Sequence, residues 1–161
     1  MFKKKRFEYT KNSRDLKKTL ARPEVPFVKD FCYAMRTRMK WLNLIIGGVT
    51  GTVARYTLSG LVYQIFGSSF PYGTLVVNLT GCFLIGFFAS LAEEKFLLGP
   101  NARILLMAGF CGAFTTFSTF IYETANLMKE GDMLRAGLNV LVSVAAGLLC
   151  MKLGILAAEI L

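Results

Sequence analysis

Four long apolar stretches dominate this sequence and leave few folds open to it. They run over about 42–66, 72–92, 104–122 and 134–161. A membrane-spanning helix needs about 20 mostly apolar residues, and each stretch supplies that length. Hydrophobic residues make up 54% of the chain, more than is usual for a soluble domain. The sequence therefore predicts an all-α membrane protein with four transmembrane helices.

Short connections join the four stretches, over 67–71, 93–103 and 123–133. Helices that are joined by short loops pack as antiparallel neighbours. Residues 41–161 are therefore expected to form one four-helix transmembrane domain. In the first stretch, Gly47 and Gly51 are four residues apart, a spacing that lets two helices approach closely.

The basic charge of the chain lies at its N-terminus. Residues 1–40 hold thirteen Lys/Arg and four Asp/Glu, whereas residues 41–161 hold six of each. No apolar core follows the early lysines, so this segment is not expected to be a signal peptide. It is either a disordered cytosolic tail that touches anionic lipid headgroups, or untranslated sequence before a start at Met39 or Met35. Because no basic face exists beyond it, no nucleic-acid partner is predicted.

The residue types give little support to catalysis. The chain has no histidine, and its cysteines at 32, 82, 111 and 150 form no CxxC or Cys/His cluster. No nucleophile–base pair or metal cluster can be assembled from such a set. The sequence therefore predicts a protein that is not an enzyme, with thiols buried among apolar side chains.

The loop charges give the bundle almost no preferred orientation. Lys95 and Arg103 lie on one side of the predicted bundle, and Lys129 and Arg135 lie on the other. Orientation in a membrane follows the distribution of Lys and Arg, with acids counting little. Without its tail, the bundle is therefore expected to insert either way round.

Arg55 stands within the first apolar stretch, and no acid occurs between it and Ala92. A charged residue at membrane depth usually faces a protein interior or a water-filled cavity. A fixed positive charge in such a place would attract an anion. The alternative is that the long side chain of Arg55 reaches the membrane interface.

Two pairs of polar residues are spaced by four within apolar stretches, Thr74 with Asn78 and Asn139 with Ser143. Residues at this spacing lie on one face of a helix. Hydrocarbon cannot satisfy their amide and hydroxyl groups. Each pair is therefore either a set of hydrogen bonds between helices or part of a polar pathway.

The third stretch has an unusual centre, which reads Gly109-Phe110-Cys111-Gly112-Ala113-Phe114-Thr115-Thr116-Phe117-Ser118-Thr119-Phe120. Phe114, Phe117 and Phe120 are expected to stack along one side of the helix. Such a stripe is usually packing, but the positive ring edges can also contact an anion. Gly112 and the following threonine pair allow a break in the helix, and carbonyls freed by a break suit Na⁺.

These segments together resemble the Fluc (CrcB) family of fluoride channels. The matching pieces are Gly47-Gly48-x-x-Gly51-x-x-x-Arg55-Tyr56, Gly73-Thr74-Leu75-x-Val77-Asn78-x-x-Gly81-Cys82-Phe83, and the run from Gly109 to Phe120. They occur in the family's order, and the resemblance covers about residues 41–161. The third piece, with the Asn78 motif upstream, is highly specific.

The resemblance implies an antiparallel, dual-topology dimer of four-helix subunits, with the third helix broken near its middle and two narrow pores. The activity it implies is passive, fluoride-specific export from the cytoplasm across the inner (plasma) membrane, which reduces fluoride toxicity. The bilayer and fluoride itself are then the partners, beside the second subunit.

By this resemblance, Asn78, Phe117 and Phe120 line the fluoride pore, and Thr74 and Ser143 fall on its polar part. Arg55 matches the arginine of the aqueous vestibule. The backbone carbonyls of Gly112 and Thr115, from both subunits, would hold a structural Na⁺ at the dimer interface. Asn139 falls where some members carry a tyrosine, and the resemblance assigns it no role.

The basic tail departs from the family pattern. An excess of nine positive charges on the cytosolic side should fix every N-terminus inside, which conflicts with an antiparallel homodimer. The remaining expectations are a homodimer that starts near Met39 or overcomes its tail, and a heterodimer with an oppositely oriented homologue.

Two other functions are weighed against the channel. A small multidrug-type exporter also has about four helices, but it needs an acid within a span for coupling, and the first three stretches hold none before their ends. A non-transporting membrane scaffold or accessory subunit would tolerate Leu or Ala at Asn78, Phe117 and Phe120.

Overall fold

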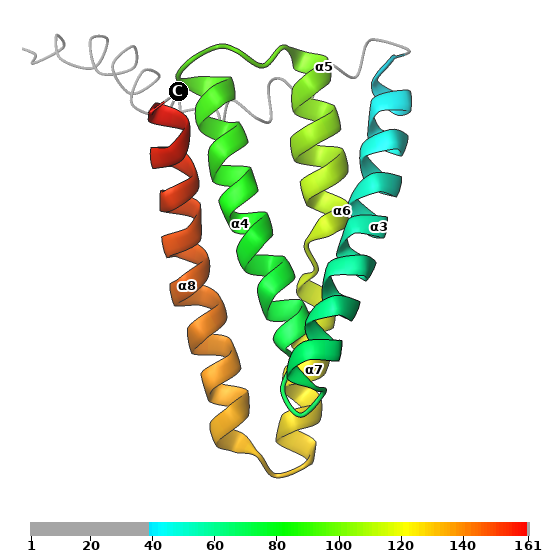
Figure 1. Cartoon of the computed structure of the whole chain (residues 1–161), viewed down its shortest axis with the longest axis vertical. Coiled ribbons are helices and arrows are strands. Elements are labelled where there is room, and N and C mark those ends of the chain that lie inside the picture. Colours follow the sequence, from blue (N-terminus) through cyan, green and yellow to red (C-terminus); the bar gives the residue numbers. More distant parts are fainter. Residues whose placement is uncertain (1–38, 161) are drawn as a thin grey trace, which may run out of the picture. The chain divides into compact units, whose positions relative to one another are not determined.

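The computed structural model describes residues 39–160, so the predictions about the N-terminal tail and its translation start lie outside the described residues. Every regular element in residues 39–160 is helical, which confirms the all-α prediction for this part of the chain. In chain order the elements are α3 (Met39–Phe66), α4 (Tyr72–Glu93), α5 (Pro100–Arg103), the π-helix η1 (Ile104–Cys111), α6 (Gly112–Phe114), α7 (Phe117–Lys129) and α8 (Met133–Glu159) (Figure 1).

Three helical runs are long and apolar enough to cross a membrane, Tyr72–Glu93, Pro100–Lys129 and Met133–Glu159. The second of them combines α5, η1, α6 and α7. Helix α3 has 28 residues and is long enough as well, but its hydroxyl residues and Arg55 make it less apolar than the other three. The chain therefore has the length and composition of a multi-pass helical membrane protein.

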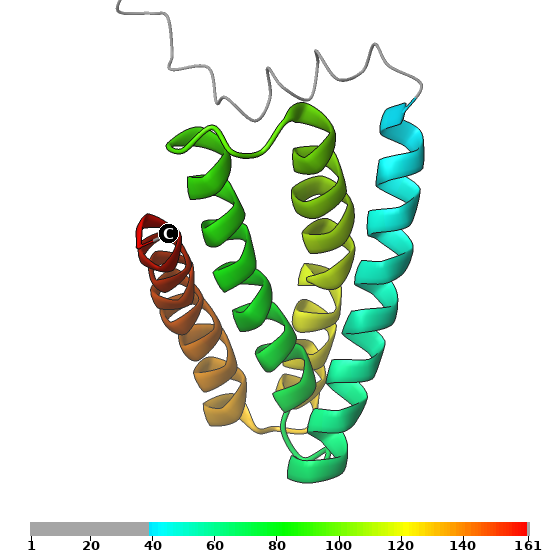
Figure 2. The ribbon, with the colours of Figure 1, turned by 45° about the horizontal axis from the view of Figure 1, so that its top comes forward.

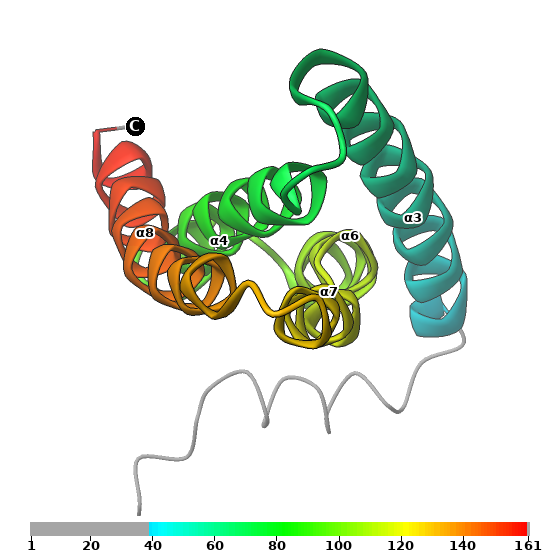
Figure 3. The ribbon, with the colours of Figure 1, turned by 90° about the horizontal axis from the view of Figure 1, so that it is seen from below.

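The helices are arranged as two neighbouring pairs. Helices α4 and α8 lie side by side, and α3 lies along the run from α5 to α7 (Figures 1 and 2). Seen from below, α4 lies between α8 and the column formed by α6 and α7 (Figure 3). Consecutive spans run in opposite directions, as the short connections predicted.

The boundaries of the third stretch were predicted wrongly. The helical run begins at Pro100 and ends at Lys129, so the expected loop over 123–133 shrinks to the three residues after Lys129. Hydropathy ends the stretch at Tyr122 because Glu123 follows, but a single charged residue does not end a helix. Glu123 therefore belongs to α7.

A tight turn joins α7 to α8. Gly131 has a φ of +82°, a conformation that favours glycine, and its N–H donates to the Met128 carbonyl over 3.1 Å. The next N–H, from Asp132, donates to the Leu127 carbonyl over 2.9 Å, which completes a Schellman motif. The Asp132 carboxylate then caps α8 by accepting from the Arg135 N–H over 3.1 Å. These bonds fix α7 and α8 as antiparallel neighbours.

Glycines let the paired helices touch backbone to backbone. A Cβ added at Gly47 or Gly51 of α3 would overlap the backbone of η1 at Leu105 or Phe110. Between α4 and α8, a Cβ at Gly86 would overlap Met151, and one at Gly154 would overlap the Phe83 carbonyl. The close approach that the spacing of Gly47 and Gly51 predicted is therefore present, and a second one joins the other pair of helices.

We expect Gly51→Ala to destabilise the protein by about 1–3 kcal/mol, because the new methyl group meets backbone that cannot move aside without moving η1. Gly48→Ala, on the same helix, is the matched control, since a Cβ at Gly48 would meet no neighbouring atom within 4 Å. The control should leave the free energy of unfolding unchanged or raise it by up to about 1 kcal/mol, because alanine has a higher helix propensity than glycine. Thermal unfolding in detergent measures both variants. Equal melting temperatures for the two would contradict the close α3–η1 contact.

Candidate functional site

The third helical run is broken at two threonines. Thr115 (φ −82°, ψ 159°) and Thr116 (φ −150°, ψ 112°) have extended backbones between α6 and α7. Thr116 caps the new helix, because its Oγ1 accepts from the Thr119 N–H over 3.3 Å. Its hydroxyl also donates to Thr119 Oγ1 over 2.8 Å. The predicted break near the middle of the third helix is therefore confirmed, and α7 begins as a separate helix.

Asn78 of α4 holds the extended segment in place. Its Oδ1 accepts from the Thr116 N–H over 2.9 Å, and its Nδ2 donates to the Thr116 carbonyl over 3.1 Å. One amide side chain therefore satisfies both backbone groups of one residue, as a neighbouring strand would. Nδ2 carries two hydrogens, and one of them is used in this way. The alternative reading of Asn78, a hydrogen bond between helices, is thus present in the structure.

The break releases two carbonyls from their places in a continuous helix. The Gly112 carbonyl would accept from the Thr116 N–H in such a helix, but that N–H donates to Asn78. The Thr115 carbonyl would accept from the Thr119 N–H, which donates to the Thr116 hydroxyl instead. These are the two carbonyls that the resemblance assigned to Na⁺, and backbone carbonyls at a helix break are suitable Na⁺ ligands. In residues 39–160 no three His, Cys, Asp or Glu gather to hold a metal ion.

A cavity of about 330 Å³ lies beside the break, and we call it the break cavity. It brings four of the predicted site residues together: Asn78, Gly112, Thr115 and Phe117. The rest of its wall includes Cys82, Met107 and Cys111, so most of its lining is apolar. A small ion in this space would meet few polar groups apart from Asn78 and the threonines.

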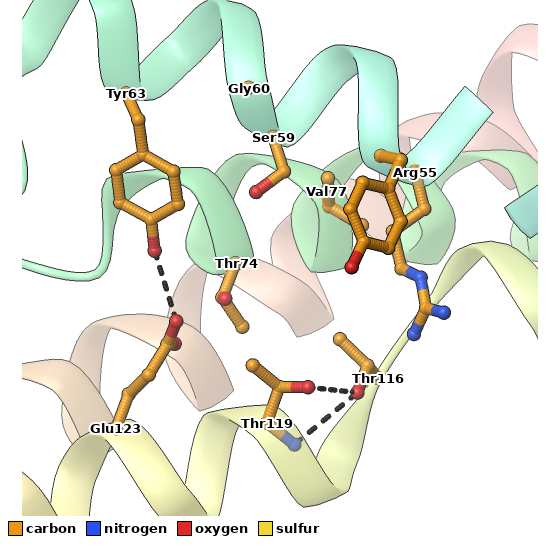
Figure 4. A pocket seen from close by; sticks show the side chains of 10 residues that line it. Arg55, Ser59, Gly60, Tyr63, Thr74, Val77, Thr116, Thr119 and Glu123 are labelled. Atoms are coloured by element: carbon orange, nitrogen blue, oxygen red, sulfur yellow. Dashed lines mark hydrogen bonds between the residues drawn. The ribbon is translucent and has the colours of Figure 1, made fainter. Parts of the chain in front are cut away.

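A second cavity, of about 470 Å³, holds Arg55 and Thr74, and we call it the Arg55 cavity. Figure 4 shows the side chains of Arg55, Thr74, Thr116 and Thr119 turned toward the same space. Arg55 therefore faces an open cavity lined by three of the helices, which favours the first of its two predicted readings. Thr116 lines both cavities.

Sequence reasoning missed Glu123 and Tyr63. The Tyr63 hydroxyl donates to Glu123 Oε1 over 3.0 Å across the Arg55 cavity (Figure 4), and Glu123 Oε2 is buried with no hydrogen-bond partner among the described residues. The statement that the first three spans hold no acid before their ends is therefore wrong. The available signal was spacing, because Glu123 follows Phe117 and Phe120 at intervals of three.

The phenylalanines do not form one stripe. The break separates them into two pairs: Phe110 with Phe114, whose ring centroids are 5.6 Å apart, and Phe117 with Phe120, at 5.9 Å. The expected stacking of Phe114 with Phe117 and Phe120 is therefore wrong, because the chain changes direction between them. Phe117 is 75% exposed on the chain, whereas Phe120 is buried.

The two polar residues of the pair on α8, Asn139 and Ser143, have different surroundings. Asn139 is buried and donates to Thr124 of α7 over 2.8 Å, so it joins two helices. The Ser143 hydroxyl oxygen is buried with no hydrogen-bond partner among the described residues. Neither Ser143 nor Phe120 lines the break cavity or the Arg55 cavity. The structure thus places most of the predicted site residues in one or other of the two cavities and leaves Ser143 and Phe120 outside both.

A family model decides what kind of protein carries this site. The model described as "CrcB-like protein, Camphor Resistance (CrcB)" matches residues 42–155, well over half of the chain. The chain belongs to the CrcB family. The matched range contains every predicted site residue and excludes the basic tail.

This chain matches several relatives over nearly their whole length. Proteins named fluoride-specific ion channel FluC are 48% identical over 118 residues in Methylocella silvestris, 51% over 114 residues in a Geobacter species, and 52% over 114 residues in Chlorobaculum tepidum. The matches span 71–72% of this chain and 90–92% of those proteins. The resemblance to the Fluc (CrcB) family is therefore confirmed.

Proposed function

We propose that this chain is a fluoride-specific ion channel that lets cytoplasmic fluoride leave the cell passively and so reduces fluoride toxicity. The observation that carries the proposal is the identity of about half of the residues with proteins named fluoride-specific ion channels, over 90–92% of their length. A channel is not a catalyst, so the proposal also holds that the chain is not an enzyme. Three spans of sufficient length and apolarity support a multi-pass membrane protein, and we propose that its membrane is the plasma membrane.

The start of α7 supports an anion pathway. The first N–H groups of a helix have no partners within it, and the helix dipole places partial positive charge at this end. Here that end lies at the break, next to Asn78 and the threonine hydroxyls. Fluoride must exchange its hydration shell for donors that do not hold it too tightly. An amide, hydroxyls and a helix start provide several such donors in sequence.

Phe117 and Phe120 are proposed to contact fluoride with their ring edges. Their rings are tilted by 41° with centroids 5.9 Å apart, so each ring turns its edge in a different direction. Ring edges carry partial positive charge, which a small anion can meet without full dehydration. With Asn78, Thr74 and Ser143 they make up the proposed pore, and Arg55 attracts the anion into the vestibule.

We further propose that Na⁺ binds at the carbonyls of Gly112 and Thr115, where it joins the two subunits. The support is the release of both carbonyls from helix hydrogen bonding, together with the exposure of Gly112 on the surface of the subunit. The ion would supply positive charge that holds the break open and the subunits together. In solutions where N-methylglucamine replaces Na⁺, fluoride flux should fall with time and return when Na⁺ is added; unchanged flux would argue against the ion.

A second subunit is proposed to complete the pore. Phe117 and Ser118, both exposed in the single subunit, lie beside the break and would otherwise face lipid. The partner is a second copy in the opposite orientation or an oppositely oriented homologue. Cross-linking of the purified protein in membranes distinguishes a homodimer from a chain that stays single without its homologue.

Fluoride efflux from sealed liposomes tests the channel directly. Liposomes that contain the purified protein should release fluoride rapidly and retain chloride, and protein-free liposomes should retain both. Equal release of the two anions would refute fluoride specificity. Residues 39–161 alone should support the same efflux as the full chain, because the family match begins at residue 42.

A further inference from the structure

Asn139 begins a chain of buried hydrogen bonds that ends at the Phe120 carbonyl. Its side chain is 1% exposed, and a buried amide is costly unless it is hydrogen-bonded. Its Nδ2 donates to Thr124 Oγ1 over 2.8 Å, and the Thr124 hydroxyl donates to the Phe120 carbonyl over 2.7 Å. Thr124 and Phe120 are buried as well. Two consecutive bonds therefore connect α8 to the backbone of a proposed pore residue.

Helix α7 depends on such lateral connections because no continuous helix precedes it. The extended residues 115 and 116 interrupt the run, so the preceding helix cannot set the direction of α7. Three polar connections attach it to three different helices instead. They are Asn78 of α4 to Thr116, Tyr63 of α3 to Glu123, and Asn139 of α8 to Thr124.

The chain from Asn139 has a fixed direction. The Thr124 hydroxyl has one hydrogen, and the N–H of Asn139 can only donate to it. The Thr124 hydrogen is therefore left for the Phe120 carbonyl. This arrangement fixes the hydroxyl, the carbonyl and the turn of α7 that carries the Phe120 ring.

We propose that Asn139 is a positioning residue for fluoride conduction, which fixes the Phe120 ring through Thr124 and the first turns of α7. The inference rests on the proposed function, and it assigns Asn139 no contact with the ion. A purely structural connection would matter only for the amount of folded protein. A positioning connection also sets the flux of each folded channel.

Two substitutions that keep the branching of the side chain break the chain of bonds at different points, Asn139→Leu and Thr124→Val. Each should lower the fluoride flux per folded protein about fivefold, the size expected from losing one buried hydrogen bond. Thr124→Ser keeps the hydroxyl and should restore the flux. Thr57→Val is the matched control, because Thr57 also donates to the carbonyl four residues earlier, over 3.0 Å, but on the exposed face of α3. It should leave the flux unchanged.

The double variant Asn139→Leu/Thr124→Val separates a positioning role of Asn139 from a purely structural one. Removing both polar partners leaves no buried group unsatisfied, so its thermal stability should return toward that of the wild type. Its flux should nevertheless stay as low as in the single variants, because the chain to Phe120 is still broken. Wild-type flux in the double variant, or in both single variants, would overturn the proposal.

Amide hydrogen exchange tests whether Asn139 holds α7 in place, and this measurement does not depend on the protein's being a channel. Residues 117–124 should exchange faster in both single variants than in the wild type and in Thr57→Val. If the wild type itself releases no fluoride, the proposed function fails, and the exchange rates still report whether Asn139 holds α7. Unchanged exchange together with unchanged flux would overturn the positioning role alone.

Discussion

Asn78→Ala is expected to lower fluoride flux about a hundredfold, because losing two part-buried hydrogen bonds to Thr116 costs about 2–3 kcal/mol. Without the amide, the Thr116 N–H and carbonyl lose their partners on α4. The Thr116 N–H would then be free to bond the Gly112 carbonyl, which would close the break. The change also removes a donor from the break cavity. Flux of fluoride from liposomes, normalised to inserted protein, is the measurement.

Asn78→Asp separates the role of the amide as an acceptor from its role as a donor. An aspartate can still accept from the Thr116 N–H, but when ionised it cannot donate to the carbonyl or to an anion. Its flux should be at least as low as that of the alanine variant, because a negative charge now faces the path of an anion. Thr80→Ala, on the same helix but in neither cavity wall, is the control and should conduct normally. Normal flux in Asn78→Ala would mean that neither the break nor the donor matters.

Phe117→Leu is expected to lower fluoride flux about fivefold, because the contact of a ring edge is worth about 1 kcal/mol and leucine has no positive edge to offer. Phe117 suits this test better than Phe120. It is 75% exposed in the subunit, so the change leaves no cavity within the subunit, whereas Phe120 is 7% exposed and its loss would also disturb packing.

Phe96→Leu is the matched control for Phe117→Leu. Phe96 is 80% exposed and lies in the loop between α4 and α5, away from both cavities. The control should conduct like the wild type and melt at the same temperature. The proposed role of the ring edge fails if Phe117→Leu conducts normally, or if its loss of flux is matched by an equal loss in Phe96→Leu.

The sequence predicted the helices well because membrane spans follow a simple physical rule about apolar length. It also predicted the break, since glycine and two threonines interrupt an apolar run at membrane depth. It did not predict what holds the break open. A lone asparagine on another helix can bond to many backbone groups, and only the packed arrangement brings Asn78 to Thr116.

The misjudged residues share a cause. Glu123 was assigned to a loop because a charge lowers the local hydropathy, although its burial depends on Tyr63, which lies 60 residues away. Phe114 was grouped with Phe117 because a stripe assumes one continuous helix. The first error comes from ending the third stretch where its apolar character ends, and the second from drawing the phenylalanine stripe without the break that the same segment predicted.

The turn between α7 and α8 has a mechanical consequence. Only three residues separate the two helices, and the bond from Asn139 to Thr124 closes this hairpin farther up. Below Thr124, then, the two helices are joined at both ends of the hairpin. The few residues between the break and Thr124 carry both phenylalanines, and they are held by Asn78 at one end and by Asn139 at the other. A channel built in this way keeps the two phenylalanines proposed for its pore on one short segment that is clamped at both ends.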